Sequence, residues 1–253
     1  LVRQGKKTRL PVTFLFIPEE EDASPTSRAR IEEGARGHKY ALVMEPGRDG
    51  DRVVTSRKGV GRFTLTVKGT ASHAGVRHQD GRSAIKEIAH QILTVEGMTD
   101  YERGITTNVG LISGGTGVNV VPQECVAEDD LRVPNPTIAE EMTARLLGLS
   151  ARDPDVKHTV GGGMNRPPYT KDAGIASLFD HAKELAKEIG FKLEDVPLTG
   201  GGSDGNFTAA LGVPTLDGLG ADGKGAHTDY EQIYFSSLEP RTKLWVKLFE
   251  TLK

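Results

Sequence analysis

The sequence predicts an α/β protein with a smaller α+β domain inserted into it. Near both ends of the chain, short apolar runs without alternation lie next to helical stretches, a pattern typical of a parallel sheet covered on both faces. Between them, the strand-like segments alternate between apolar and polar residues, which indicates strands with one solvated face. We therefore expect a larger domain built from residues 1–58 and 164–253 and an inserted domain over residues 59–163.

The first region contains two apolar strands, Val12–Ile17 and Ala41–Met44, and acidic residues follow both of them. Between these strands a helix is expected from Ser24 to about Gly34. Ser24 suits the N-cap, and the proline after it suits the first helical position.

The middle region is expected to form a self-contained antiparallel sheet with two helices. Thr137 and Glu140 fit a capping box at the start of the second helix. The element order is β-α-β-β-α-β, which is the ferredoxin-like arrangement. In chain order the expected elements are strand Arg62–Lys68, helix Ser83–Val95, strand Thr107–Ser113, a long strand Val118–Val133, helix Thr137–Leu149 and strand Asp155–Val160.

The third region returns to α/β character. The residues of the terminal helix expected to face inward are Leu244, Trp245, Leu248 and Leu252. The expected elements are helix Ala173–Ile189, a short helix opened by Thr199–Asp204, strand Val213–Gly220 and helix Ser237–Lys253.

Composition narrows the class of protein. A net charge of -3 gives no electrostatic reason to expect nucleic acid or an anionic membrane as a partner. No apolar run approaches the roughly 20 residues that span a bilayer. The single cysteine, Cys125, excludes an intrachain disulfide and is expected to be a small buried or edge hydrophobe. This composition fits a cytoplasmic protein, although export is not excluded.

Acidic residues at the ends of two strands are the most informative feature of the sequence. Glu19, Glu20 and Glu21 follow the first apolar run, Glu45 follows the second, and His227 lies late in the chain between small residues. Burying several unpaired carboxylates costs several kcal/mol each, and a divalent cation would remove that cost. Carboxylate and imidazole are ligands suited to zinc or a similar metal. The alternative is a solvated run of charge after a strand.

Several short motifs occur together in a fixed order along the chain. They are Pro18-Glu19-Glu20-Glu21, Met44-Glu45-Pro46, Gly69-Thr70-Ala71-Ser72-His73-Ala74-Gly75, Asn119-Val120-Val121-Pro122, Asp130-Leu131-Arg132, Gly200-Gly201-Gly202-Ser203-Asp204 and His227. With these motifs the chain resembles the di-zinc aminoacyl hydrolase family from about Val12 to its end. This family includes the bacterial glutamate carboxypeptidase, acetylornithine deacetylase and succinyl-diaminopimelate desuccinylase.

The resemblance implies a catalytic centre with two zinc ions per subunit. Glu20 matches the general base that deprotonates a metal-bridging water, and Glu21 matches an adjacent metal ligand. Glu45 matches the ligand of the other zinc, and His227 the ligand that shares a zinc with Glu21. Ligand type alone leaves cobalt and manganese open.

The resemblance also implies a set of substrate-binding residues. His73 matches a lid histidine that polarises the scissile carbonyl, reaching a partner subunit's site across a dimer. Asn119 and Arg132 match residues that hold the substrate's carboxylate, and the planar fork of arginine suits this task. Gly202 matches a position of close substrate approach, and Arg166 is a weaker substrate candidate.

Each of these substrate-binding residues also has a plain structural interpretation. The segment around His73 could be a polar turn after a strand, and Arg132 could form a surface ion pair with Asp129 or Asp130. The glycine-rich loop around Gly202 could be an ordinary turn. A phosphate cradle is rejected because no P-loop lysine follows it.

The family's His-x-Asp motif and its metal-bridging aspartate have no counterpart before Val12. With Leu1–Gly5 reading as the end of a helix, this leads us to expect a fragment of a longer protein. Two functions therefore stay open. The parent would be a metal-dependent hydrolase that cuts an amide next to a free carboxylate, either a carboxypeptidase or an N-acyl amino acid deacylase, and a homodimer through the inserted domain. The chain itself could be catalytically silent.

Overall fold

The computed structural model describes residues 5–48, 50 and 52–253. The chain divides into two compact units: unit 1 is Leu1–Arg57 with Tyr169–Lys253, and unit 2 is Lys58–Pro168. The second boundary falls later than the predicted one at residue 164, because the last strand of unit 2, β6 (Lys157–Arg166), runs beyond it.

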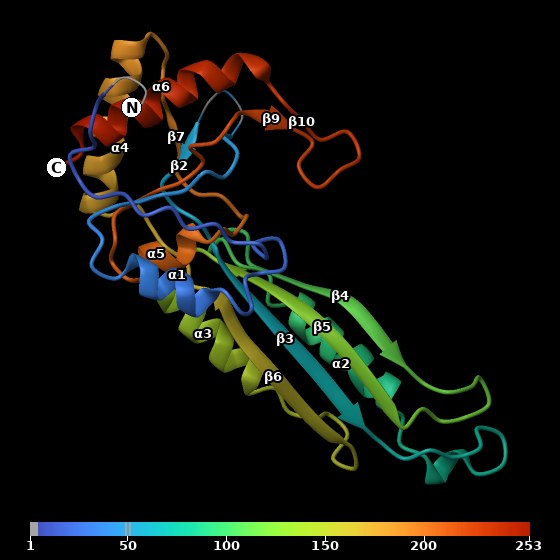
Figure 1. Cartoon of the computed structure of the whole chain (residues 1–253). Coiled ribbons are helices and arrows are strands. Elements are labelled where there is room, and N and C mark those ends of the chain that lie inside the picture. The colour runs from blue at the N-terminus through green and yellow to red at the C-terminus, as the bar shows by residue number, and fades with distance from the viewer. Residues whose placement is uncertain (1–4, 49, 51) are drawn as a thin grey trace. The chain divides into compact units, whose positions relative to one another are not determined.

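Unit 2 is a four-stranded antiparallel sheet in the order β4-β5-β3-β6 (Figure 1). Helices α2 and α3 cover one face of this sheet. The predicted ferredoxin-like arrangement is therefore present. The elements are β3 (Gly59–Lys68), η2 (His78–Asp80), α2 (Ala84–Glu96), β4 (Thr106–Gly114), β5 (Glu124–Val133), α3 (Pro136–Leu147) and β6.

Alternating burial along the central strands builds the core of unit 2. Phe63, Leu65 and Val67 of β3 are at most 1% exposed, while the residues between them face outward or are half-buried. Ile88 of α2 packs in the same cluster. Cys125 of β5 is buried there too, as the sequence predicted.

Two local predictions for unit 2 were wrong. Helix α3 is capped by Asn135, whose side chain accepts from the backbone N–H of Ile138, and not by a capping box at Thr137. Pro136 at the first position explains this, because its missing N–H costs nothing there. Strand β5 begins at Glu124 rather than Val118, because the preceding residues form the loop that joins it to β4.

Unit 1 carries the remaining elements, and its sheets are two-stranded. β1 pairs with β8 and β2 with β7, both in parallel, whereas β9 and β10 form an antiparallel hairpin. The elements are α1 (Arg28–Ala35), β1 (Ala41–Leu42), β2 (Val53–Val54), α4 (Ala173–Ile189), β7 (Asp195–Val196), α5 (Gly205–Ala210), β8 (Thr215–Leu216), β9 (Gly223–Lys224), β10 (Gln232–Ile233) and α6 (Phe235–Thr251).

The core of unit 1 lies between its two long helices and the short parallel strands. Leu178 of α4 and Leu244 and Leu248 of α6 are buried in one cluster with Leu216 of β8. Helix α4 matches its predicted range, and Gly190 in the left-handed conformation ends it. No helix among the described residues is both long and apolar enough to cross a membrane.

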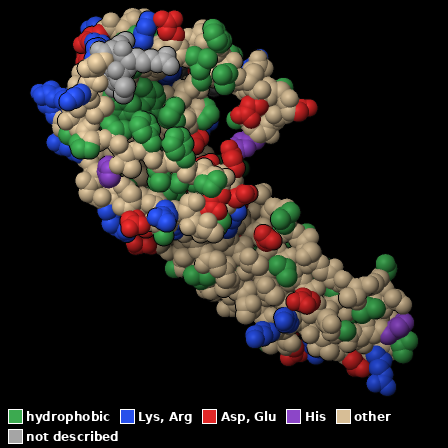
Figure 2. Space-filling model, in the orientation of Figure 1, with side chains coloured by type: hydrophobic (Ala, Val, Ile, Leu, Met, Phe, Trp, Pro, Cys, Tyr) green, Lys and Arg blue, Asp and Glu red, His purple; other side chains and the backbone are tan. Residues whose placement is uncertain are grey.

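Two predictions for unit 1 were wrong. Residues 12–17 form no strand, and Phe14 and Phe16 are 65% and 88% exposed, because no neighbouring strand pairs with them in the described chain. Figure 2 shows hydrophobic side chains gathered on the surface of this unit. Helix α1 begins after Ser27 rather than Ser24, which has a left-handed φ of 52°. The predicted helix end at Leu1–Gly5 lies outside the described residues except for its glycine.

Candidate functional site

The turn after residue 17 separates the three consecutive glutamates by role. The carboxylate of Glu19 turns inward and accepts from the backbone N–H groups of Thr26, at 2.8 Å, and Ser27, at 2.5 Å. Hydrogen bonds from Ser27 and Thr26 hold the pKa of Glu19 below its usual value. Glu19 therefore stabilises the turn, which leaves Glu20 and Glu21 for other tasks.

Glu21 meets the predicted histidine. His227 Nδ1 lies 3.6 Å from Glu21 Oε2, and both side chains are more than three-quarters exposed. Figure 2 shows a histidine of this unit beside acidic side chains. His227 lies in the loop between β9 and β10 and has a φ of 63°, a conformation that a non-glycine residue rarely adopts. Such strain is typical of positions held for function.

Glu45 follows β1 and completes an acidic neighbourhood. Burial, and then the negative charges of Asp217 and Glu20, raise its pKa to about 7. Glu21 adds a smaller effect in the same direction, whereas the positive charge of Arg57 opposes it. The structure therefore brings all the predicted acids and the histidine of unit 1 into one region.

These residues match a metal in donor type but not in arrangement. Carboxylates and an imidazole suit zinc, and mutual repulsion among the acids would favour a bound cation. Within the described parts of the chain, however, no group of three or more His, Cys, Asp or Glu side chains is arranged to hold a metal ion. The described residues thus supply donors of a suitable type for a metal ion but do not by themselves complete a two-metal centre.

A buried ion pair, which the sequence reasoning missed, lies beside this region. Arg57 Nε donates to Asp217 Oδ2 at 2.7 Å, and both side chains are fully buried. Arg57 Nη1 also donates to the backbone oxygens of Gly201, at 2.9 Å, and Gly202, at 3.4 Å. The pair therefore fixes the glycine-rich loop that carries Gly202. The sequence did contain a signal for this pair. Asp217 lies within an apolar run, and a carboxylate buried there needs a positively charged or hydrogen-bonding partner.

In unit 2 the structure brings His73 and Asn119 together. The backbone N–H of Ala74, the residue after His73, donates to the backbone oxygen of Asn119 at 2.9 Å. The N–H groups of Gly75 and Val76 both donate to His73 Nδ1, at 3.1 and 3.2 Å. Because Nδ1 accepts these bonds, the neutral ring carries its proton on Nε2, where it can donate to a ligand.

The two predicted arginines of unit 2 have different environments. Arg132 donates to Asp130 through two atoms, at 2.6 and 2.9 Å, which is the ion pair that the sequence left open as an alternative. Asp129, the other partner considered, is instead 3% exposed on the helix-covered side. Arg166, at the end of β6, is 5% exposed. In this structure neither guanidinium group is open to bind a substrate carboxylate, because Arg132 is paired with Asp130 and Arg166 is buried.

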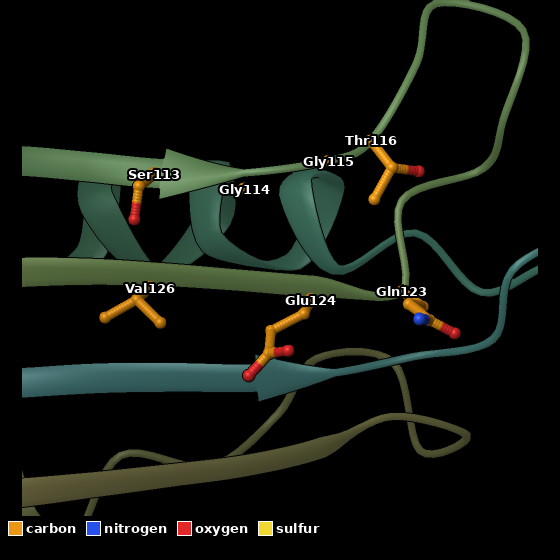
Figure 3. Close-up of a pocket in the computed structure, with 7 residues that line it drawn as sticks. All are labelled: Ser113, Gly114, Gly115, Thr116, Gln123, Glu124 and Val126. Atoms are coloured by element: carbon orange, nitrogen blue, oxygen red, sulfur yellow. The ribbon is translucent and has the colours of Figure 1, made fainter.

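A shallow cavity of about 250 Å³ lies where β4 and β5 meet their connecting loop (Figure 3). Glu124 is the one charged residue among its lining residues, and none of the predicted site residues lines it. This cavity is therefore not the predicted active site.

Comparison with known proteins finds similarity over one unit and over most of the chain. Residues 55–151 match the M20 peptidase dimerisation domain. Carboxypeptidase G2 from Pseudomonas sp. is 30% identical over 238 residues, covering 91% of this chain and 56% of that protein. Succinyl-diaminopimelate desuccinylase from Albidiferax ferrireducens is 27% identical over 262 residues, covering 97% of this chain and 65% of that protein.

Solved structures share the fold at lower identity. Aminopeptidase PepT from Bacillus cereus superposes with a TM-score of 0.68 at 23% identity, covering 88% of this chain and 61% of that one. YXEP from Bacillus subtilis, described as a dinuclear metal binding peptidase from the M20 family, gives 0.65 at 17% identity, covering 92% and 62%. The chain thus spans less than two thirds of the length of each of these four proteins. It carries an M20 peptidase dimerisation domain and is a homologue of carboxypeptidase G2 and succinyl-diaminopimelate desuccinylase.

Proposed function

We propose that this chain is part of a metal-dependent hydrolase that cleaves an amide or peptide bond next to a free carboxylate, as a glutamate carboxypeptidase does. The observation that carries the proposal is the meeting of Glu20, Glu21, Glu45 and His227 in one region of unit 1. The relationship to carboxypeptidase G2 supports the reaction class. Desuccinylases are also relatives, so deacylation of an N-acyl amino acid is the second candidate.

In this proposal the residues of unit 1 supply the base and the metal donors. Glu20 takes the proton of the attacking water, because its neighbour Glu19 is held by the turn and Glu21 is directed to His227. Glu21, Glu45 and His227 would hold metal together with donors beyond these three. A metal bound there would lower the pKa of its water ligand and polarise the scissile carbonyl. Zinc suits the donor types, and cobalt or manganese would also be accepted.

Three residues of unit 2, together with Gly202 of unit 1, recognise substrate in this proposal, and His73 of unit 2 polarises its carbonyl. His73, protonated on Nε2, donates to the carbonyl oxygen as negative charge develops on it. Asn119 and Arg132 hold the substrate's carboxylate. Arg132 must exchange Asp130 for that carboxylate, and both members of this ion pair are about one-third exposed, so the exchange costs little. Gly202 and Arg166 are proposed as further contacts with substrate.

A second copy of the chain is the proposed partner of unit 2. Strand β4 is one edge of the sheet, and an edge strand presents N–H and C=O groups that can pair with another strand. Leu111 and Ile112 on this strand are 64% and 55% exposed, and Leu93 on neighbouring α2 is 74% exposed. A homodimer through this edge would cover these side chains and agrees with the dimerisation domain.

The test is hydrolysis of matched substrate pairs by the metal-loaded protein. We expect an acyl-glutamate or a peptide with a C-terminal glutamate to be cleaved and its amidated analogue to be cleaved poorly. Release of succinate from N-succinyl amino acids in preference to both would favour the desuccinylase alternative. Equal cleavage of free and amidated substrates would contradict the proposed carboxylate recognition.

A further inference from the structure

The turn that follows Glu21 is strained and buried. Ala23 and Ser24 have φ values of 70° and 52°, in the left-handed region that residues other than glycine seldom occupy. They are 5% and 0% exposed. Two consecutive residues stay in this conformation only where the surrounding structure holds them.

Backbone and side-chain bonds both hold the turn. The N–H groups of Ala23 and Ser24 donate to the oxygens of Glu20 and Glu19, each at 2.9 Å. The hydroxyl of Ser24 donates to Asp204 Oδ1 at 2.7 Å, across 180 positions of sequence. This bond ties the acidic turn to the end of the glycine-rich loop.

A second serine continues the connection. The hydroxyl of Ser203 donates to Asp217 Oδ2 at 2.5 Å and accepts from the N–H of Gly205 at 3.0 Å. Asp217 follows β8, which pairs with β1, and Glu45 lies three residues after the end of β1. The N–H of Gly220, three residues after Asp217, donates to the backbone oxygen of Glu45 at 2.8 Å. The loop is thus joined to the segment that carries Glu45.

We propose that Ser24 and Ser203 are positioning residues. The Ser24 hydroxyl joins the turn with Glu20 and Glu21 to the loop with Gly202, and the Ser203 hydroxyl joins that loop to Asp217. The segment of Asp217 is in turn bonded to the backbone of Glu45 through Gly220. A carboxylate on an isolated turn would lose its placement through small backbone movements, and these hydrogen bonds restrict that movement. The roles of the three segments rest on the proposed function, but the mechanical connection rests on geometry alone.

The connection is tested by hydrogen–deuterium exchange on the full chain, comparing Ser24→Ala with wild type. Loss of this one hydrogen bond is expected to raise exchange about tenfold. We expect this increase both in peptides covering 19–27 and in peptides covering 200–206, with α4 unchanged. Ser177→Ala, which removes an exposed hydroxyl from α4 of the same unit, is the matched control and should leave both segments unchanged.

Two further variants keep the test decisive if Ser24→Ala folds poorly. Asp204→Ala should raise exchange in the same two segments, and Asp204→Asn, which keeps an oxygen to accept the hydroxyl, should restore most of the protection. A rise confined to the mutated segment, or an equal rise in every segment including α4, would overturn the proposal. Hydrolysis is not a readout here, so failure of the proposed hydrolase function is distinguished from failure of this connection.

Discussion

We expect Asp129 to contribute less to the stability of unit 2 at neutral pH than at acidic pH. Its side chain is 3% exposed in β5, among apolar neighbours on the helix-covered face. Its Oδ1 accepts from the N–H of Asn108 at 3.1 Å, whereas Oδ2 is buried without a hydrogen-bond partner in the described structure. Burial raises the pKa of Asp129 from 3.8 to about 6, and the charges of Asp130 and Glu96 add to this.

The sign and size of the effect follow from this difference in proton affinity. An acid with a raised pKa in the folded state favours folding while it is protonated, and this contribution is lost as pH rises from the unfolded value of 3.8 to the folded value of about 6. At about 1.4 kcal/mol for each tenfold change in affinity, the total loss is about 3 kcal/mol. About 2 kcal/mol of it is expected between pH 4.5 and pH 8.

The assay is denaturant unfolding at several pH values, read by hydrogen exchange of β5 peptides so that the signal comes from unit 2. Asp129→Asn should remove most of this pH dependence. The amide oxygen can still accept from Asn108, although burying its NH2 group costs about 1–3 kcal/mol at every pH. Glu128→Gln removes a charge from the neighbouring exposed position of β5, which does not affect the pKa of Asp129, and controls for net charge. A pH profile of Asp129→Asn that parallels wild type would refute the reasoning.

Three further predictions concern other parts of the chain. Asp217→Asn leaves Arg57 as an unpaired buried charge and should lower the free energy of unfolding of unit 1 by about 3–5 kcal/mol, measured by urea titration; a loss below about 1 kcal/mol would contradict the buried pair. Ala23→Gly relieves a φ of 70° and should leave stability equal or higher, unlike the usual loss of about 0.5–1 kcal/mol for this change; a loss of that size would contradict the strain. Leu111→Lys should give monomers by light scattering, whereas Thr159→Lys on β6, at the other edge of the sheet, should leave the dimer intact; dimers in both variants would exclude the β4 edge.

The sequence predicted the middle unit well because its signals are local. The alternation of apolar residues along β3 and their helical spacing along α2 each specify one buried face. The four strands of the sheet then pair their backbone N–H and C=O groups with one another. The range of α4 was predicted correctly for the same reason, since its apolar stripe and Gly190 both lie within the helix and its end.

Other features depend on partners distant in the sequence and could not be predicted from local patterns. Residues 12–17 have the composition of a strand, but a strand needs a neighbour to pair with. Ser24 looked like an N-cap because serine followed by proline is common there, yet its hydroxyl bonds to Asp204. The ion pair of Arg57 with Asp217 joins positions 160 apart, which no spacing rule connects.

The residues of the candidate site were proposed from the sequence, and their individual roles came from the family resemblance rather than from physical arguments about the residues. Composition and spacing alone identified the acidic residues at the two strand ends and indicated that a bound cation would offset the cost of burying them. Which glutamate has which task depends on the turn, where Glu19 bonds to the backbone of Thr26 and Ser27. The pairing of Arg132 with Asp130 was open in the sequence because residues two apart on a strand share a face.

The most direct test of the proposed site is to measure metal content and hydrolysis on the same metal-loaded samples of wild type, Glu20→Gln and Glu21→Gln, with Asp22→Asn as the control for loss of a neighbouring charge. We predict that Glu20→Gln keeps the wild-type metal content and loses about 100-fold to 10,000-fold in turnover, as expected for loss of a general base. Glu21→Gln should lose metal as well as turnover, and Asp22→Asn should change neither. Near-normal turnover in Glu20→Gln, or equal metal loss in Glu20→Gln and Glu21→Gln, would contradict the division of roles between these two neighbouring glutamates.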